Sequence, residues 1–276
     1  MKSISIVELA RNEVKDLEPC VHGGDVWKSV RNYGLRCEDI LDFSANVNPL
    51  GPSQKAIEAI KNNLWQIPFY PDPSSDALRE AISHHIEEVN PDNVIVGNGS
   101  TELIYLFSEV FMQKEDESLI PSPTFGEYES AVRRAGGKPR HIKSNRDFTI
   151  NLTNFLKEIK PTTKAIFLCN PNNPTSTLIP KENLLEIIEN ASKKHVLIFL
   201  DEDFVEFVDE EKRFSLASEV KAYRNLFVLR SFTKVFGLTG LRVGYGIACE
   251  EIINLLFRAK MPWNVNCLAQ AAAIAT

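Results

Sequence analysis

Cysteine, long apolar runs and basic clusters are all scarce in this sequence. The five cysteines form an odd set without a CxxC pair, so we expect reduced, mostly structural thiols and no metal site. No stretch approaches the about 18 apolar residues of a membrane helix, and frequent charges near the N-terminus argue against a signal peptide. We therefore expect a cytoplasmic protein that neither enters a membrane nor is exported.

The charge balance is mildly acidic, with 31 Lys and Arg against 37 Asp and Glu and a net charge of −6. Without a dense basic run nothing indicates a nucleic-acid partner, and a small-molecule substrate is the better expectation. With 276 residues and 43% hydrophobic content, the chain can bury a substantial core. This size suggests one large domain and a smaller part.

From residue 93 onward, short apolar runs alternate with segments of helical period. This alternation is typical of a mostly parallel sheet covered by helices, so we predict a three-layer α/β/α fold. The expected strands are 93–96, 117–120, 164–169, 195–200, 225–229 and 242–248. The expected helices are 101–111, 125–135, 181–194 and 251–260.

Residues 1–68 have a different composition. Gly, Pro and Asn cluster in HGG at 22–24 and in NVNPLGP at 46–52, which indicates an N-terminal arm and an irregular lead-in. The segment 70–82 then enters a helix after Pro and Asp residues. We therefore expect residues 1–68 to belong to the arm and the small-domain region, and residues 69–276 to form the large domain.

The first candidate motif is VGNGSTELIYLF, in which an apolar strand ends at Gly97 and Gly99 and a helix begins near Ser100 and Thr101. Backbone N–H groups and the positive end of the helix would face one point, a geometry that binds phosphate. Taken alone, a capped strand-to-helix turn explains the motif more often. A dinucleotide fingerprint is disfavoured because Glu102 occupies the position of its third glycine.

The second motif is RSFTKVFGLTGLRVGYG, which places Lys234 near Ser231, Thr233 and Arg242. A lysine at a buried strand end becomes nucleophilic when burial or neighbouring cations lower its pKa. A solvated surface lysine is the common alternative. Ser231 to Lys234 also fits the SxxK pattern of penicillin-binding proteins, but neither SDN nor KTG follows.

Two further strands end in polar groups. Asp201 ends the apolar run HVLIFL, where α/β proteins bind ligands, although capping of the next turn is an equally good explanation. Two opposite charges 4 Å apart attract each other by about 4 kcal/mol at an effective dielectric of 20. A ring nitrogen beside the Asp201 carboxylate would therefore stay protonated. The loop NPNNPTST projects Asn173 from the same edge, and Phe125 follows another strand. Both have purely structural alternatives, a turn and a core aromatic.

In order and spacing, these motifs together resemble fold type I pyridoxal phosphate enzymes, the aspartate aminotransferase superfamily. The resemblance implies pyridoxal 5'-phosphate as the cofactor, residues 69–276 as the domain that binds it, and Lys234 as the lysine that holds it as a Schiff base. It also implies a homodimer, in which Tyr70 reaches the cofactor phosphate of the neighbouring subunit. By the same resemblance, Phe125 would stack on the face of the cofactor ring, Asp201 would pair with the ring nitrogen, and Asn173 would hydrogen-bond the ring hydroxyl. The cofactor phosphate would contact Ser100, Thr101, Ser231, Thr233 and Arg242.

Within the superfamily, HGGDVW, LDFSANVNPLGP and MPWNVNCLAQAA look like the threonine-phosphate decarboxylases. That likeness implies decarboxylation of L-threonine O-3-phosphate to (R)-1-amino-2-propanol O-2-phosphate in cobalamin biosynthesis, and so a carboxy-lyase. His22, Gly23, Asn46 and Asn173 would contact this phosphorylated amino acid. The alternative is an aminotransferase acting on histidinol phosphate or a similar substrate, whose family usually has Tyr where this chain has Phe204.

Two departures from the superfamily pattern are present. Ser176 stands where a glycine is usual, and the chain ends at Thr276, where members of the superfamily continue into a small domain with substrate-binding arginines. We therefore expect the C-terminal small domain to be missing. This supports a third possibility, a truncated protein that binds pyridoxal phosphate without turnover.

Overall fold

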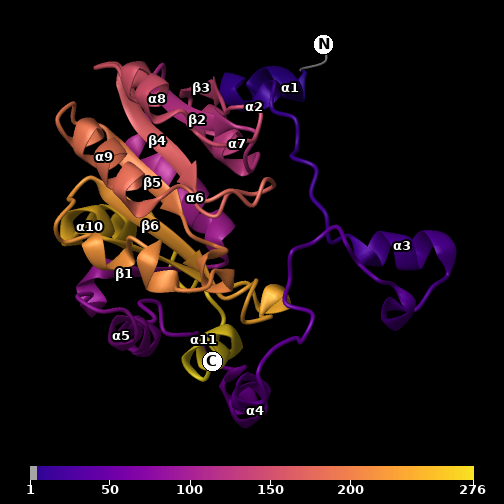
Figure 1. The fold of residues 1–276 in the computed structure, drawn as a ribbon. Coiled ribbons are helices and arrows are strands. Elements are labelled where there is room, and N and C mark those ends of the chain that lie inside the picture. The colour runs from indigo at the N-terminus through magenta and orange to yellow at the C-terminus, as the bar shows by residue number, and fades with distance from the viewer. Residues whose placement is uncertain (1–4) are drawn as a thin grey trace.

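A seven-stranded sheet forms the centre of the computed structural model, which describes residues 5–276. The spatial order is β1-β7-β6-β5-β4-β2-β3, and only β7 runs antiparallel to its neighbours. The strands are β1 (Val94–Gly97), β2 (Glu117–Ser122), β3 (Lys138–Lys143), β4 (Thr163–Cys169), β5 (Leu197–Asp201), β6 (Leu226–Ser231) and β7 (Gly244–Ala248). The predicted three-layer α/β fold is confirmed (Figure 1).

The helices precede, connect and follow these strands. They are α1 (Ile6–Leu9), α2 (Asn12–Lys15), α3 (Val26–Tyr33), α4 (Gln54–Asn62), α5 (Asp76–His85), α6 (Ser100–Phe111), α7 (Glu127–Arg134), α8 (Leu152–Glu158), α9 (Lys181–Ser192), α10 (Glu250–Ala259) and α11 (Cys267–Ile274). Within the described part of the chain, no helix has the length and apolarity needed to cross a membrane.

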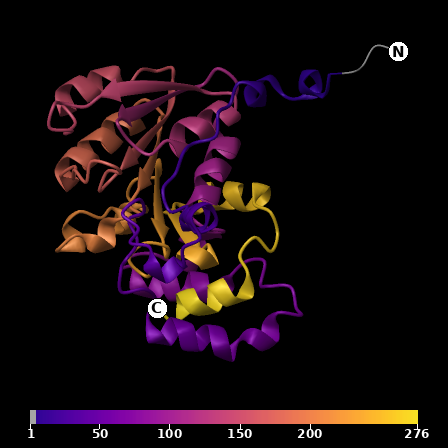
Figure 2. The same cartoon turned by 90° about the vertical axis from the view of Figure 1, so that its right-hand side faces the viewer.

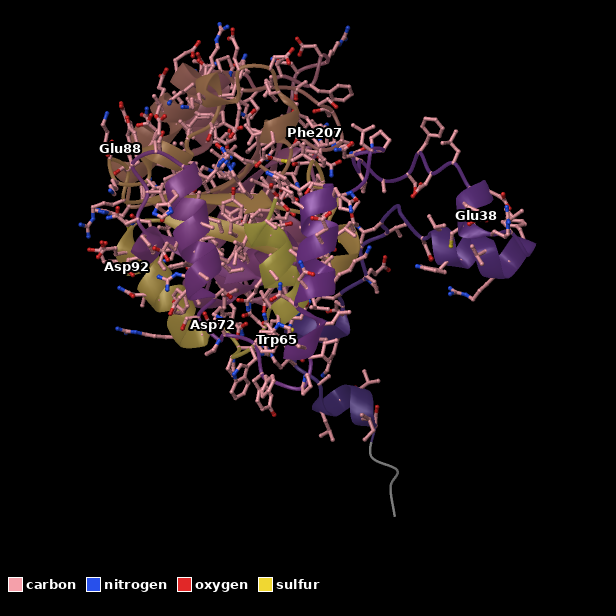
Figure 3. All side chains as sticks on the ribbon, turned by 90° about the horizontal axis from the view of Figure 1, so that it is seen from below. Glu38, Trp65, Asp72, Glu88, Asp92 and Phe207 are labelled. Atoms are coloured by element: carbon pink, nitrogen blue, oxygen red, sulfur yellow. The ribbon has the colours of Figure 1, made fainter. Side chains whose placement is uncertain are left out.

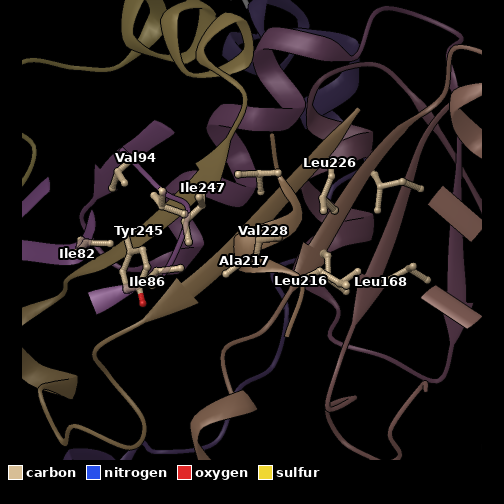
Figure 4. Close-up of a cluster of buried hydrophobic side chains, with 14 of the residues drawn as sticks. Ile82, Ile86, Val94, Leu168, Leu216, Ala217, Leu226, Val228, Tyr245 and Ile247 are labelled. Carbon is tan, nitrogen blue, oxygen red and sulfur yellow. The ribbon is translucent and has the colours of Figure 1, made fainter. Parts of the chain in front are cut away.

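One face of the sheet is covered by α4, α5, α8, α9 and α11. Aliphatic side chains dominate this layer, among them Ile82 of α5, Val228 of β6 and Ile247 of β7, and Figure 4 shows these three within one cluster. Successive strand residues point to opposite faces of a sheet, so each of these strands supplies every second side chain to this layer.

The opposite face is covered by α6, α7 and α10 and is rich in aromatic residues. Phe107 of α6 contacts Phe167, Phe199 and Phe227, with ring centroids 5.0–6.0 Å apart. Gly246 on β7 gives Phe227 its space, because a Cβ there would lie 2.1 Å from Cζ of that ring. The two layers bury both faces of the sheet, as a mostly parallel sheet requires.

The predicted strands and the four predicted helices from residue 93 onward are all present, but β3, α8 and α11 were not predicted. The sequence KPRHIK of β3 is mostly basic, and its residues are exposed or only partly buried at the edge of the sheet. An edge strand exposed in this way lacks the apolar run by which buried strands are recognised.

Residues 5–52 run along the side of the sheet as an extended segment with short helices, and α3 stands away from the body (Figure 1). Asp25 caps the start of α3 by accepting from Lys28 N at 3.0 Å, and Gly34 ends the helix at φ 66°. Both signals occur in the sequence, although only irregular structure was predicted here. In Figure 3, Glu38 likewise lies apart from the rest of the molecule.

The next segment rejoins the body. Ser53 caps α4 through Ala56 N, and α4 packs against the C-terminal helix α11, as the turned view of Figure 2 also shows. Residues 46–52 thus connect the outlying segment with the layer that contains α4.

Candidate functional site

The predicted site residues come from different strands but meet at one edge of the sheet. β1, β4, β5 and β6 run in the same direction, so the loops that follow them open on the same side. A pocket there is lined by Ser100, Thr101, Phe125, Tyr128, Cys169, Asn173, Asp201, Asp203, Phe204, Thr233, Lys234, Thr239 and Arg242. Eight of the predicted residues therefore surround one cavity.

One side of the pocket is built to receive an anion. Helix α6 begins at Ser100, directly after Gly99, whose φ of 81° suits glycine. A Cβ on Gly99 would lie 2.5 Å from Nη2 of Arg242, so the guanidinium packs closely over this turn. The helix start, the hydroxyls of Ser100 and Thr101 and the cationic Arg242 together favour a phosphate group.

Ser231 does not line the pocket but supports a residue that does. It is fully buried, its Oγ accepts from Thr233 N at 3.0 Å, and the two hydroxyl groups lie 2.7 Å apart. Thr233 lines the pocket, whereas Ser231 does not. Ser231 thus fixes the orientation of Thr233.

Two buried carboxyl groups form the floor of the pocket. The Asp201 carboxylate accepts from the Tyr128 hydroxyl at 2.6 Å and from Asp203 N at 2.9 Å. Burial raises the pKa of Asp201 well above its usual range, and the nearby Asp203 raises it further. A buried carboxylate is stable only beside a cation, so this position calls for a positively charged ligand group.

Asp203 is the second of these groups. Burial raises its pKa to about 6, while Lys234 and the hydrogen bond from Ser100 oppose the shift. Ser100 Oγ donates to its Oδ2 at 3.0 Å, whereas its Oδ1 has no hydrogen-bond partner among residues 5–276. Asp203 is one of the residues that line the pocket.

Lys234 lines the same pocket as the two carboxyl groups. Its Nζ is 5.6 Å from the centre of the Phe204 ring. The lead-in segment holds the backbone of this loop. Asn48 N donates to the Lys234 carbonyl at 3.1 Å, and Asn48 Nδ2 donates to the Val235 carbonyl at 2.7 Å. The NVNPLGP motif therefore supports the lysine from outside the pocket.

A second cleft adjoins the first and shares Asn173 and Phe204 with it. Asn46 lines its polar side, and Phe207 and Val208 contribute apolar surface. Asn46 and Asn173, which were predicted to contact substrate, thus lie in the same cleft.

Besides Ser231, three predicted site residues lie outside both cavities. Tyr70 is 80% exposed and stacks on Trp263, with ring centroids 4.6 Å apart. His22 binds Glu127, with 2.5 Å between Nε2 and Oε1. Gly23 packs on Ser44, whose carbonyl oxygen would lie 1.8 Å from a Cβ added to the glycine.

Sequence reasoning missed Tyr128, Asp203 and Asn48. Asp203 follows Asp201 by two residues, so alternation along the chain could have indicated it. Tyr128 lies in the PSPTFGEY motif, but only the fold shows that its hydroxyl reaches a strand end 73 residues away. Asn48 binds two backbone carbonyls of the lysine loop, which no sequence pattern specifies.

The pocket fits pyridoxal phosphate on each of three counts. The Gly99 turn with Arg242 offers a phosphate site, Lys234 offers a primary amine for the aldehyde, and the buried Asp201 requires a cation such as a protonated pyridine nitrogen. These features, at the strand ends of a mostly parallel sheet, define a pyridoxal phosphate-dependent enzyme of fold type I.

The chain belongs to the aminotransferase class I and II family, whose model matches residues 38–276. Pyridoxal 5'-phosphate is accordingly its cofactor, as predicted. A histidinol-phosphate aminotransferase from Methanosarcina mazei is 39% identical over 275 residues, which are 100% of this chain and 73% of that protein. The corresponding enzyme from Moorella thermoacetica is 36% identical, over 99% and 69% of the two chains.

Two solved structures agree with this placement. Histidinol-phosphate aminotransferase from Clostridium acetobutylicum has a TM-score of 0.77 and 31% identity, covering 86% of this chain and 69% of that one. L-threonine-O-3-phosphate decarboxylase from Porphyromonas gingivalis has a TM-score of 0.72 and 28% identity, covering 83% and 69%. The present chain thus covers about 70% of the length of these relatives.

The prediction of a threonine-phosphate decarboxylase, and with it a carboxy-lyase of cobalamin biosynthesis, is wrong. Curated relatives at 34–39% identity are histidinol-phosphate aminotransferases. The error has a physical origin, because the residues around Lys234 hold the cofactor in either class of enzyme. The reaction depends on which bond to the α-carbon of the substrate breaks, and this depends on how the substrate is oriented. The HGG and MPWNVN motifs do not determine that orientation.

Proposed function

We propose that this chain transfers the amino group of a phosphorylated amine of the histidinol phosphate type, with Lys234 as the cofactor lysine. The observation that carries the proposal is the convergence of Lys234, Asp201 and Arg242 in one pocket. The aminotransferase relatives support amino transfer as the reaction. Because these relatives are histidinol-phosphate aminotransferases, they also support a phosphorylated amine as the substrate.

Bound pyridoxal phosphate would supply an electron-withdrawing ring that weakens the bonds to the α-carbon of the substrate. Asp201 would hold the proton on the ring nitrogen, and Tyr128 would keep its carboxylate in place. Phe125 would cover one face of the ring. Lys234 Nζ would bind the aldehyde and then move a proton to and from the α-carbon, because transamination requires loss of that proton.

The adjoining cleft is the proposed substrate site. Asn46 and Asn173 offer amide groups to the polar part of the substrate, while Phe204 and Phe207 give an apolar wall. Phe204 has no phenol group that could donate a hydrogen bond. Asn173 would therefore be the donor to the hydroxyl oxygen of the cofactor ring. The contacts of His22 and Gly23 with substrate stay a prediction.

An amino-transfer assay tests the reaction. The purified chain with pyridoxal phosphate, L-histidinol phosphate and 2-oxoglutarate should form glutamate, whereas Lys234→Ala should form none. Glu210→Gln, which changes an exposed side chain, is the matched control and should keep full activity. Absence of glutamate at saturating substrate, with cofactor bound through Lys234, would contradict the proposed reaction.

We also propose a homodimer in which Tyr70 reaches the neighbouring subunit's phosphate site. Tyr70 and the adjacent Trp65 and Phe69 are 80%, 66% and 64% exposed, and Figure 3 shows Trp65 at the surface. Large exposed apolar patches mark interaction surfaces. Mixing Lys234→Ala chains with Tyr70→Phe chains should then restore activity, because one hybrid site regains both residues. No gain on mixing would place Tyr70 outside the neighbouring site.

The division of the chain at residue 68 belongs to the same proposal. Residues 69–276 contain every strand of the described chain and all lining residues of the cofactor pocket. Residues 46–48 line the second cleft and hold the lysine loop. Asn48→Ala removes the hydrogen bond from its side chain to the lysine loop and should therefore weaken cofactor binding, measured by absorbance titration, while the chain stays folded.

A further inference from the structure

Three side chains with different metal-binding atoms meet where the N-terminal segment crosses the start of α7. The Cys20 thiol, an imidazole nitrogen of His22 and a carboxylate oxygen of Glu127 all lie within 4.8 Å of one another. Ligands at about 2.0–2.3 Å from a tetrahedral zinc ion are roughly 3.5 Å apart. Side-chain movements of about 1 Å would therefore bring the three atoms to ligand distances.

The environment of Glu127 calls for a cation. Its side chain is 9% exposed, Oε2 accepts from the Tyr105 hydroxyl at 2.6 Å, and Oε1 lies 2.5 Å from His22 Nε2. A buried carboxylate is costly unless a positive charge faces it. Either a protonated imidazole or a metal ion would satisfy it, and the nearby thiol favours the metal because thiolate is a ligand of zinc.

The remaining geometry also suits an ion. The His22 side chain is 46% exposed, so an ion could enter from solvent and a water molecule could take the fourth position. On metal binding the Cys20 thiol would release its proton to solvent, and the resulting thiolate and the carboxylate would together carry two negative charges, which a divalent ion neutralises. Tyr105 holds the second carboxylate oxygen, as outer groups around metal ligands commonly do.

We propose that Cys20, His22 and Glu127 bind one divalent transition-metal ion of the zinc type. The ion would fasten the N-terminal segment to α7 beside the cofactor pocket, because the His22 ring lies 5.6 Å from that of Phe125. None of the three ligands lines the cofactor pocket or the adjoining cleft. The proposal therefore uses none of Lys234, Asp201 and Arg242, the residues that carry the proposed amino transfer.

Cobalt(II) is the probe, because a thiolate ligand gives it a charge-transfer absorbance that nitrogen and oxygen ligands do not. The band is measured as the difference from the cofactor-loaded chain without cobalt. The cofactor-loaded full chain should bind one cobalt ion with this band, and zinc should displace it. Cys20→Ser should abolish the band, and His22→Gln and Glu127→Gln should weaken binding at least about tenfold. Tyr105→Phe should lower the affinity about 10–100-fold, as loss of an outer-shell contact does.

Two variants serve as matched controls. Cys37→Ser removes an exposed thiol, and His141→Gln removes a nearby imidazole that binds Glu129 at 2.9 Å without a cysteine. Both should leave cobalt binding unchanged. His22 is half-exposed, so His22→Gln keeps the fold and decides the matter even if a change at the buried Glu127 impairs folding.

The proposal fails if the parent chain shows no thiolate band at saturating cobalt. It also fails if the band survives Cys20→Ser, or if His22→Gln binds cobalt as tightly as the parent. Circular dichroism of each variant confirms that the compared chains are folded.

Discussion

Glu206 is a buried carboxyl whose protonation should control stability near neutral pH. Its Oε1 lies 3.3 Å from Nη1 of Arg230, whereas its Oε2 has no hydrogen-bond partner in the described residues 5–276. Arg230 is also shared with Glu202 and Glu211, so three carboxyl groups face one guanidinium. Burial raises the pKa of Glu206 from 4.5 to about 7, although Arg230 opposes the shift.

The direction of this pKa shift determines how the stability of the folded chain depends on pH. The folded state holds the proton more tightly than the unfolded chain, so the stability contributed by Glu206 is full below pH 4.5 and is lost as the pH rises through about 7. A pKa difference of about 2.5 is worth about 3 kcal/mol in total, of which about 2.5 kcal/mol falls between about pH 5 and about pH 8.

Glu206→Gln keeps the shape, supplies an N–H at the unpaired position and removes the titration. Relative to the parent chain, its free energy of unfolding should rise by about 2.5 kcal/mol between about pH 5 and about pH 8. Urea unfolding at each pH, with saturating pyridoxal phosphate, measures this difference. Glu210→Gln, an exposed control, should show no such rise. A variant that tracks the parent chain at every pH would refute the assignment.

Three other substitutions test the packing and the site. Gly246→Ala places a Cβ 2.1 Å from Phe227 and should lower the free energy of unfolding by about 1–3 kcal/mol in urea; unchanged stability would contradict the close contact. Arg230→Ala removes the cationic partner of Glu202, whose side chain is 0% exposed, and should lower the free energy of unfolding by about 3–5 kcal/mol; unchanged stability would contradict this role of the ion pair. Gly99→Ala forces Arg242 to move from its 2.5 Å approach and should weaken cofactor binding in an absorbance titration without unfolding the chain; equal affinity would place the phosphate elsewhere.

The sheet was predictable because buried strands and amphipathic helices have distinct periods. Runs such as HVLIFL became strands buried on both faces, with Phe199 and Leu200 in opposite core layers. The charged edge strand β3 gave no such signal. The ordered helices α3 and α4 have clear caps in Asp25 and Ser53, which were outweighed by the Gly and Pro residues around them.

The candidate site was predictable where function follows strand ends, as at Asp201 and Lys234. Contacts that depend on distant segments were not. The Tyr128 hydroxyl on Asp201 and the His22 imidazole on Glu127 join residues 73 and 105 positions apart. Substrate choice was wrongly predicted because it depends on the orientation of groups around the α-carbon, which short motifs do not determine.

The most direct test of the account is to locate the lysine that binds the cofactor. Borohydride reduction of the chain with pyridoxal phosphate, followed by proteolysis and mass spectrometry, should give one pyridoxyl-modified peptide, the one that contains Lys234. The Lys234→Ala chain should give none. A modification on another lysine, or no modified peptide in the parent chain, would contradict the central claim.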